Sequence, residues 1–252
     1  MTATGLVSVC WLHPGVVSSV FARSLVDSLL WDLQRDEPRI VTHGYGHVGN
    51  ECGTGGLVAG RNDLARIVLD HSDAEWMFMV DSDMGFAPDT IDRLIDAADP
   101  VERPVVGALC FAHKTSGRKE FNAIRYVASP TVYDFVETGT KVGFVARLGY
   151  ERDAVVPCSG TGAAAVLVHR SALAAVRGEH GDTWFDPITH PLGPTTFSED
   201  LSFCVRLAAC GIPIHVHTGV RTTHHKGGVF LDEEFFDAQQ ASPSAIPGGP
   251  DA

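Results

Sequence analysis

The sequence predicts an α/β fold in which a mostly parallel central sheet is covered by helices on both faces. Two observations support this prediction. Apolar runs short enough to be buried strands alternate with segments of helical periodicity from the N-terminus to Phe111. Hydrophobic residues also make up 44% of the 252 residues, so the chain can bury the large core that a sheet covered on both faces requires.

In the first half, continuous apolar runs predict strands, and apolar residues recurring every three or four positions predict helices. The predicted strands cover residues 6–12, 39–42, 76–80 and 104–111. Predicted helices begin at Val17, extend over 57–71, and follow Pro88, which suits a first helical turn. The glycine-rich segment 43–56 is expected to be a loop.

The second half is less regular and predicts a smaller antiparallel part. Its expected elements are antiparallel or edge strands at 126–136 and 142–148, a turn at 159–162 before an apolar strand at 163–168, a Pro/Gly-rich loop at 184–196, a helix at 199–210 stopped by Gly211, and a strand at 212–220. We therefore expect a single domain over 1–237 and a disordered tail over 238–252, which is rich in Ser, Pro, Gly and Ala.

Composition narrows the function classes. The chain has 19 Lys and Arg against 31 Asp and Glu, a net charge of −12 that argues against broad nucleic-acid binding. The sequence contains no stretch of about 20 apolar residues, so it predicts no membrane span. The six cysteines form no C-x-x-C pair and lie mostly in apolar runs, as expected for free thiols in a reducing cytoplasm.

The first chemical motif is Asp81-Ser82-Asp83, which closes the apolar run Trp76–Val80. Residues i and i+2 of an extended chain point to the same side, so the two carboxylates emerge together at the carboxyl end of a buried strand. Such carboxylates repel unless a cation lies between them, and Mg²⁺ or Mn²⁺ prefers oxygen ligands that it shares with phosphates. The motif suggests metal-dependent chemistry on a phosphorylated donor, but by itself it is equally typical of a solvated acidic loop.

Two further motifs supply acids and histidines. Ser198 followed by Glu199 and Asp200 is a helix start, where either acid could take a proton from an acceptor hydroxyl or only complement the helix dipole. The segment Thr222–Gly228 holds His224, His225 and Lys226, which offer a metal ligand and a positive charge for a diphosphate, or a surface loop. The chain has no H-E-x-x-H motif and no Cys/His cluster, which argues against zinc hydrolysis.

In this order the motifs resemble a nucleotide-sugar-dependent glycosyltransferase of the GT-A fold, most closely the family-2-like group. The resembling segments are Gly60–Ala65, Phe78–Met84, Ser159–Gly162 with Arg170, Ser198–Arg206, and His224–Lys226. The resemblance implies a Rossmann-like sheet with a smaller antiparallel acceptor-side part. It also implies an enzyme of the hexosyltransferase type that uses Mn²⁺ or Mg²⁺ and a UDP- or GDP-linked sugar, with inversion favoured over retention.

The resemblance also implies roles for individual residues. Asp83 and His224 bind the metal, with His225 as the alternative to His224, and Asp81 contacts the metal or the donor ribose. The remaining donor-binding residues would be Trp11, His13, Arg61, Ser82, Gly160 and Lys226. Asp200 would be the base toward the acceptor, with Glu199 as its neighbour.

Two other functions stay open at this stage. A nucleotidyltransferase also pairs an α/β sheet with metal-binding aspartates, but it would usually place a basic glycine-rich loop after the first strand, and Pro14–Ser19 contains no basic residue. A non-catalytic module would bind a nucleotide sugar without turnover. The acceptor can be a glycan, a small molecule, a protein hydroxyl or a modified base.

Overall fold

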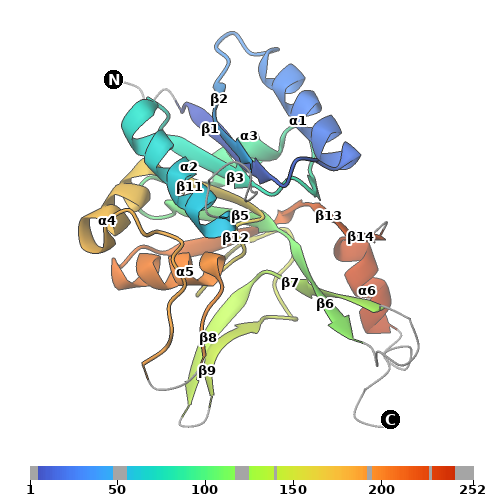
Figure 1. Ribbon diagram of the computed structural model, residues 1–252. Coiled ribbons are helices and arrows are strands. Elements are labelled where there is room, and N and C mark those ends of the chain that lie inside the picture. The colour runs from blue at the N-terminus through green and yellow to red at the C-terminus, as the bar shows by residue number, and fades with distance from the viewer. Residues whose placement is uncertain are drawn as a thin grey trace.

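The structure, a computed structural model, describes residues 5–47, 56–116, 125–138, 141–191, 195–226 and 229–241. Its centre is a seven-stranded sheet (Figure 1). In spatial order the strands are β10 (Val155–Cys158), β12 (Ile214–Arg221), β5 (Val105–Leu109), β11 (Ala165–His169), β3 (Trp76–Val80), β1 (Val7–His13) and β2 (Ile40–His47). The predicted fold class, a mostly parallel sheet with a smaller antiparallel part, is confirmed.

Two strands run against the other five. β11 pairs antiparallel with both β3 and β5, and β10 pairs antiparallel with β12. Asp81 donates its backbone N–H to the Ala164 carbonyl at 2.9 Å, so the antiparallel contact continues one residue beyond β3. The acidic motif is therefore anchored to the neighbouring strand at the point where β3 ends.

Helices cover both faces of the sheet, and each face has its own core. On one face lie α2 (Leu57–His71), α4 (Arg170–His180) and α5 (Glu199–Ala209). On the other lie α1 (Ser19–Asp32) and α3 (Thr90–Ala97). All five residues of β3 are buried because both of its faces are covered, which explains why it reads as an unbroken apolar run.

Three smaller sheets gather beside the main one. They are the pair β6 (Phe111–Ser116) and β7 (Arg125–Pro130), the pair β8 (Tyr133–Thr138) and β9 (Lys141–Ala146), and a sheet of β4 (Met84–Gly85), β13 (Thr223–Lys226) and β14 (Val229–Leu231). A last helix, α6 (Glu233–Ala241), packs its Phe236 into a third core with Phe111 and Tyr150. Figure 1 shows both two-stranded pairs extending away from the main sheet.

Several boundaries differ from the sequence expectations. β2 continues to His47 despite two glycines, because it pairs with β1 through that residue; the rest of the predicted loop, 48–55, lies outside the described residues. The segment 126–136 forms two strands, since the Thr131 N–H bonds to the Cys110 carbonyl at 2.9 Å where the chain turns. Helix α6 reaches Ala241 and so includes the first residues of the expected tail; 242–252 lie outside the described residues.

Helix α4 is missing from the predicted elements. Its buried residues Ala172, Leu173 and Val176 follow directly on the apolar strand β11. Only His169, Arg170 and Ser171 separate the apolar residues of the strand from those of the helix, so the change from strand to helix periodicity is hard to recognise in the sequence. Among the described residues, none of the helices combines the length and the apolar character needed to cross a bilayer.

The contact between β4 and β13 depends on a glycine. A Cβ at Gly85 would overlap Thr223 Oγ1 and Val20 Cγ1. We expect Gly85→Ala to lower the free energy of unfolding by about 1–3 kcal/mol, the usual cost of overpacking. The matched control is Gly149→Ala, because a Cβ there meets nothing within 4 Å. Urea unfolding of both variants measures the difference, and equal stabilities would contradict this account of the small sheet.

Candidate functional site

The site lies where β3 ends, at the carboxyl edge of the parallel strands. Such an edge is where open α/β sheets bind their ligands. The Asp81–Met84 turn is closed by a hydrogen bond of 3.1 Å from the Met84 N–H to the Asp81 carbonyl. The Ser18 N–H, at the start of α1, donates to the Ser82 carbonyl at 2.9 Å. The backbone of the acidic motif is thus held from two sides.

The small sheet brings the second motif to the first. β13 pairs with β4 so that His224 lies opposite Met84, and the His225 N–H donates to the Asp83 carbonyl at 2.9 Å. In this register His224 Nε2 lies 3.3 Å from Asp83 Oδ1, and Lys226 Nζ donates to Asp83 Oδ2. His225 points elsewhere, since its ring stacks on Phe230 at 4.8 Å between centroids. Parity along β13 therefore brings His224, and not His225, to Asp83.

His224 is held in an orientation that suits a metal ligand. Its side chain is nine-tenths buried, and Nδ1 lies 2.9 Å from the Phe111 carbonyl oxygen, so Nδ1 carries the proton. Nε2 is buried and makes no hydrogen bond to any described residue. Nε2 lies 3.3 Å from Asp83 Oδ1, an oxygen that can only accept a hydrogen bond or bind a cation. A cation between the two, or a proton on Nε2, relieves this contact, and a histidine that donates its other N–H to a carbonyl is the usual form of a metal ligand.

Asp83 is ionised over the whole physiological range. Burial raises the pKa of its carboxyl, but the contacts with His224 and Lys226 outweigh burial and lower the pKa to about 2. Lys226 thus supplies the positive charge that the sequence analysis assigned to a metal. The ammonium occupies one carboxylate oxygen, while the other faces His224.

Arg61 links the two halves of the site. It comes from α2, its side chain is only 4% exposed, and its guanidinium donates to Asp81 Oδ1 at 2.9 Å and to Glu199 Oε1 at 2.8 Å. Burial lowers the pKa of Arg61, but these two carboxylates outweigh burial and raise it, so the group stays charged. The sequence-based expectation placed Arg61 on the donor. In the structure it joins Asp81 to Glu199.

The first turn of α5 separates its two acids. Glu199 faces Arg61, whereas Asp200 accepts hydrogen bonds at Oδ1 from the Ser198 hydroxyl and from the Leu201 N–H. Asp200 Oδ2 makes no hydrogen bond within the described residues and lies beside Gly162, 3.6 Å from where a Cβ would stand. Ser198 therefore orients Asp200 instead of capping the helix with its hydroxyl. Asp200 Oδ2 is the oxygen that can accept a proton.

The other predicted donor residues have local roles in the structure. Trp11 packs on Phe21 at 5.9 Å between ring centroids, and His13 Nδ1 accepts the Gly15 N–H at 3.1 Å. Both lie at the carboxyl end of β1, which runs beside β3. A Cβ at Gly160 would stand 2.8 Å from Phe144 Cε1, so packing against the β8–β9 hairpin requires this glycine.

Two features of the site have no signal in the sequence. One is the Phe111 carbonyl that orients His224 across a separation of 113 residues. The other is Tyr133 near Asp200: burial, followed by the charge of Asp200, raises the pKa of Tyr133 to about 12, so the phenol keeps its proton. Both contacts join segments far apart in the chain, which periodicity and motif spacing cannot detect.

Only some of the metal ligands expected from the sequence lie together in the structure. Within the part of the chain that the structure describes, no three or more His, Cys, Asp or Glu side chains are grouped to hold a metal ion. Asp81 is turned toward Arg61, which leaves Asp83 and His224. A carboxylate oxygen beside a buried, unpartnered imidazole nitrogen still fits a Mn²⁺-class cation, which can complete its shell with water and phosphate oxygens.

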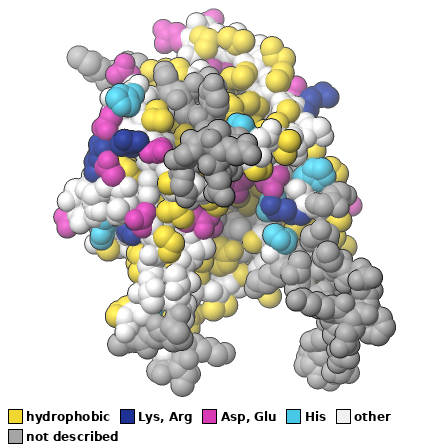
Figure 2. Space-filling view, in the orientation of Figure 1, with side chains coloured by type: hydrophobic (Ala, Val, Ile, Leu, Met, Phe, Trp, Pro, Cys, Tyr) yellow, Lys and Arg dark blue, Asp and Glu magenta, His cyan; other side chains and the backbone are white. Residues whose placement is uncertain are grey.

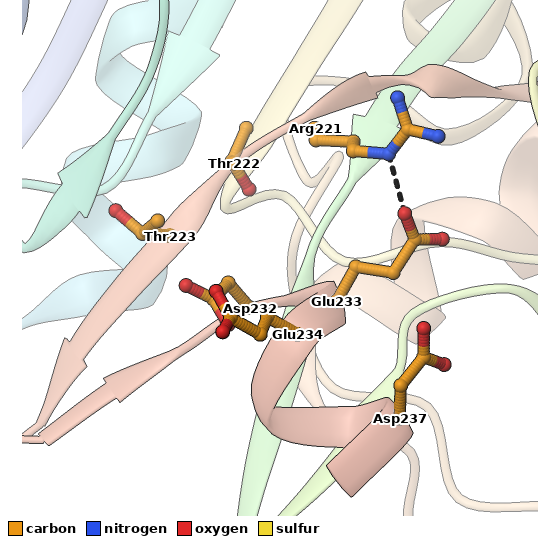
Figure 3. Close-up of a pocket in the computed structure, with 7 residues that line it drawn as sticks. All are labelled: Arg221, Thr222, Thr223, Asp232, Glu233, Glu234 and Asp237. Carbon is orange, nitrogen blue, oxygen red and sulfur yellow. Dashed lines mark hydrogen bonds and ion pairs between the residues drawn. The ribbon is translucent and has the colours of Figure 1, made fainter.

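A cavity of about 440 Å³ lies between the junction of β12 with β13 and the start of α6 (Figure 3). It is lined by Arg221, Thr222, Thr223, Asp232, Glu233, Glu234 and Asp237. Glu233, which accepts from the Tyr150 hydroxyl at 2.9 Å and from Arg221, ties α6 to the sheet. This cavity does not include Asp81, Asp83 or Asp200, and its ion pairs are structural.

Comparisons with known proteins assign no family to this chain. Neither the protein-family models nor the curated proteins gave a match to this chain. Among solved structures, A197 from STIV is similar over 90% of this chain and 91% of its own, with 12% sequence identity and a TM-score of 0.46. A likeness this distant carries no argument about the site.

Arg61 compensates two carboxylates, so its loss should be costly. We expect Arg61→Met to lower the free energy of unfolding by about 1–3 kcal/mol, because the partly exposed Asp81 and Glu199 lose their shared charged donor. Arg23→Met is the control: it removes an exposed i,i+4 pair with Asp27, which contributes at most about 0.5 kcal/mol. Chemical denaturation measures both variants. A cost for Arg61→Met no larger than for the control would show that Arg61 is not the link.

Lys226 should control the titration of Asp83. The pKa of Asp83 in the folded protein, about 2, lies below its ordinary value. Ionised Asp83 therefore contributes stability that is complete above about pH 4 and is lost as the pH falls through 2. In Lys226→Met we expect the pKa to rise, so that Asp83 is partly protonated at about pH 3.5 while the wild type stays ionised. Carboxyl ¹³C NMR reports this directly. Asp99, whose pKa is lowered by the backbone N–H groups of Glu102 and Val101, is the internal control and should not move.

Proposed function

We propose that this chain is a glycosyltransferase of the GT-A, family-2-like type that transfers a sugar from a nucleotide diphosphate-sugar to an acceptor hydroxyl. One observation carries the proposal: the buried, unpartnered Nε2 of His224 faces the ionised Asp83 at the carboxyl edge of the sheet. These two side chains offer one oxygen and one nitrogen ligand and leave the other positions around a cation empty. They therefore suit a divalent cation that is brought in with a diphosphate.

The charges around the site support a cation-dependent donor. Four carboxylates (Asp81, Asp83, Glu199 and Asp200) face two fixed positive charges (Arg61 and Lys226), so the site has an excess of negative charge. A diphosphate alone would be repelled there. A Mn²⁺ or Mg²⁺ ion held by Asp83 and His224 would stabilise the negative charge that develops on the leaving diphosphate.

The remaining residues act on the donor and its surroundings. Lys226, which extends from β13 to Asp83, can release the carboxylate and donate to a phosphate oxygen as a point charge. Arg61 keeps Asp81 at the mouth of the site, where Asp81 is available to a ribose or to a metal-bound water. Trp11 and His13 belong to the adjacent β1 edge, where a nucleotide base would lie.

Asp200 is the proposed base. Its Oδ1 is fixed by Ser198 and by the Leu201 N–H, so its Oδ2 is aimed and keeps a free lone pair. Gly162 leaves open the space next to that oxygen. An acceptor hydroxyl seated there would lose its proton to Oδ2 as its oxygen attacks the anomeric carbon, which inverts the configuration. Glu199, committed to Arg61, is a positioning residue in this scheme.

The proposal predicts a metal-dependent nucleotide-sugar complex. In a thermal-shift panel of UDP-, GDP-, ADP- and TDP-sugars, we expect one nucleotide class to stabilise the protein only when Mn²⁺ is present. Binding at a hundred times Kd contributes about 2.7 kcal/mol. Asp83→Ala should abolish this Mn²⁺-dependent shift, whereas the exposed Asp36→Ala, outside the site, should retain it.

A second variant, Asp200→Asn, tests sugar transfer separately from donor binding. Asp200→Asn should keep the Mn²⁺-dependent shift and lose transfer, measured as release of the nucleoside diphosphate. Loss of donor binding in Asp200→Asn would make Asp200 structural. Donor binding without any turnover in the wild type would favour a non-catalytic sugar-nucleotide module, and no shift with any donor would overturn the proposal.

A further inference from the structure

Helix α1 carries apolar side chains on its outer face as well as on its inner face. Its fully buried residues are Phe21, Ser24, Ser28 and Asp32, and Leu25 is partly buried against the same core as Phe21. A surface helix normally buries its apolar stripe and exposes its polar face. Exposed apolar side chains on the outer face are therefore unusual for such a helix.

Two of the inner polar residues accept hydrogen bonds from backbone groups. Ser24 Oγ accepts the Phe86 N–H at 3.0 Å. Asp32 Oδ2 accepts the N–H groups of Arg39 and Ile40 at 2.9 and 2.8 Å, where β2 begins. These contacts fix the orientation of α1 on the sheet, with Phe21 against the core and a second set of apolar residues on the outer face.

The outward residues form a continuous row, which we name the α1 stripe. It consists of Ala22, Val26, Leu30 and Leu33, whose spacing of four, four and three places them on one helical face. Val26, Leu30 and Leu33 are 52%, 56% and 66% exposed. Of the 13 large hydrophobic side chains found exposed in the described residues, six lie between Val16 and Leu33, so exposure is concentrated here. Figure 2 shows hydrophobic side chains gathered at the top, where Figure 1 places α1.

We propose that the α1 stripe is a homodimer interface, in which two copies of α1 pack antiparallel across a two-fold axis at Val26. In this arrangement Val26 meets its own counterpart. Ala22 lies opposite Leu30 of the second copy, and Ser19 lies opposite Leu33 of the second copy. Each leucine therefore faces a small side chain, which lets the two helices approach closely.

The charges flanking the stripe complement themselves in the same arrangement. Arg23 and Asp27 form an i,i+4 pair on one flank, with Nε and Oδ2 2.8 Å apart. Across the two-fold axis, Arg23 comes within two residues, about 3 Å along the helix, of Asp27 of the second copy. Arg23 of each copy can thus pair with Asp27 of the other, and the two pairs are equivalent, as an isologous interface requires.

The charge distribution favours a second copy over a lipid surface. The chain carries a net charge of −12, and Arg23 is the sole basic residue of α1. A helix that lies on a bilayer is usually rich in Lys and Arg, which attract anionic headgroups. The α1 stripe has neutral flanks in an otherwise acidic protein, so two copies can meet there with the least repulsion.

Sedimentation velocity over a range of concentrations tests the proposal on the full chain, without donor or metal. We expect the wild type to form a dimer and Val26→Glu to raise the dissociation constant at least about tenfold, because two carboxylates would meet on the two-fold axis. Val101→Glu is the matched control: Val101 is 75% exposed and lies outside α1, so this variant should dimerise like the wild type. Circular dichroism melting confirms that each variant is folded.

A charge swap tests the register. Arg23→Asp should weaken the dimer, and the double variant Arg23→Asp with Asp27→Arg should restore it. A wild type that is monomeric at every concentration would overturn the proposal, as would equal losses in Val26→Glu and Val101→Glu. Binding of a monomeric wild type to phosphatidylglycerol vesicles, lost in Val26→Glu, would assign the stripe to a membrane. None of these outcomes depends on glycosyl transfer, so they are separate from the test of the proposed function.

Discussion

The candidate site depends on the pairing of β4 with β13. These two short strands join a turn at residue 83 to a strand at residue 224, and they belong to a small sheet separate from the main one. The register places His224 on Asp83, and the adjacent Phe111 carbonyl fixes the imidazole tautomer. Because neither β4 nor β13 is long, close packing at Gly85 and the anchoring of the Asp81–Met84 turn hold the pairing in place.

Charge compensation extends from this pairing across the site. Carboxylates that are partly withdrawn from water are stabilised when each has a cation or several hydrogen-bond donors. Lys226 compensates Asp83, and Arg61 compensates Asp81 and Glu199 together. Arg61 reaches both acids because α2 and α5 cover the same face of the sheet, with Phe185 beneath its guanidinium at 5.9 Å. This arrangement keeps the first turn of α5, and with it Asp200, in a fixed position relative to the acidic motif.

The two faces of the sheet serve different ends. α2 and α5 supply Arg61, Glu199 and Asp200 to the site, so the sequence of that face is constrained by chemistry at its edge. On the opposite face, α1 supports the site through Ser18, which holds the Ser82 carbonyl, and through Ser24. With Phe21, Ser24 and Asp32 on the inner side of α1, Val26, Leu30 and Leu33 are left on the surface.

The sequence by itself determined the α/β class, most strands of the sheet, helices α1, α2, α3 and α5, and the residue types at the site. These depend on local periodicity and on short motifs, which a single sequence records directly. The antiparallel insertion of β11, the helix α4 and the end of β2 needed the tertiary structure, because pairing partners and packing decide them. The same holds for the roles within the site: which of Glu199 and Asp200 is free, and which of His224 and His225 faces Asp83, depends on contacts with Arg61 and β4. Those contacts join residues more than 100 positions apart, and only the folded chain brings such residues within reach of one another.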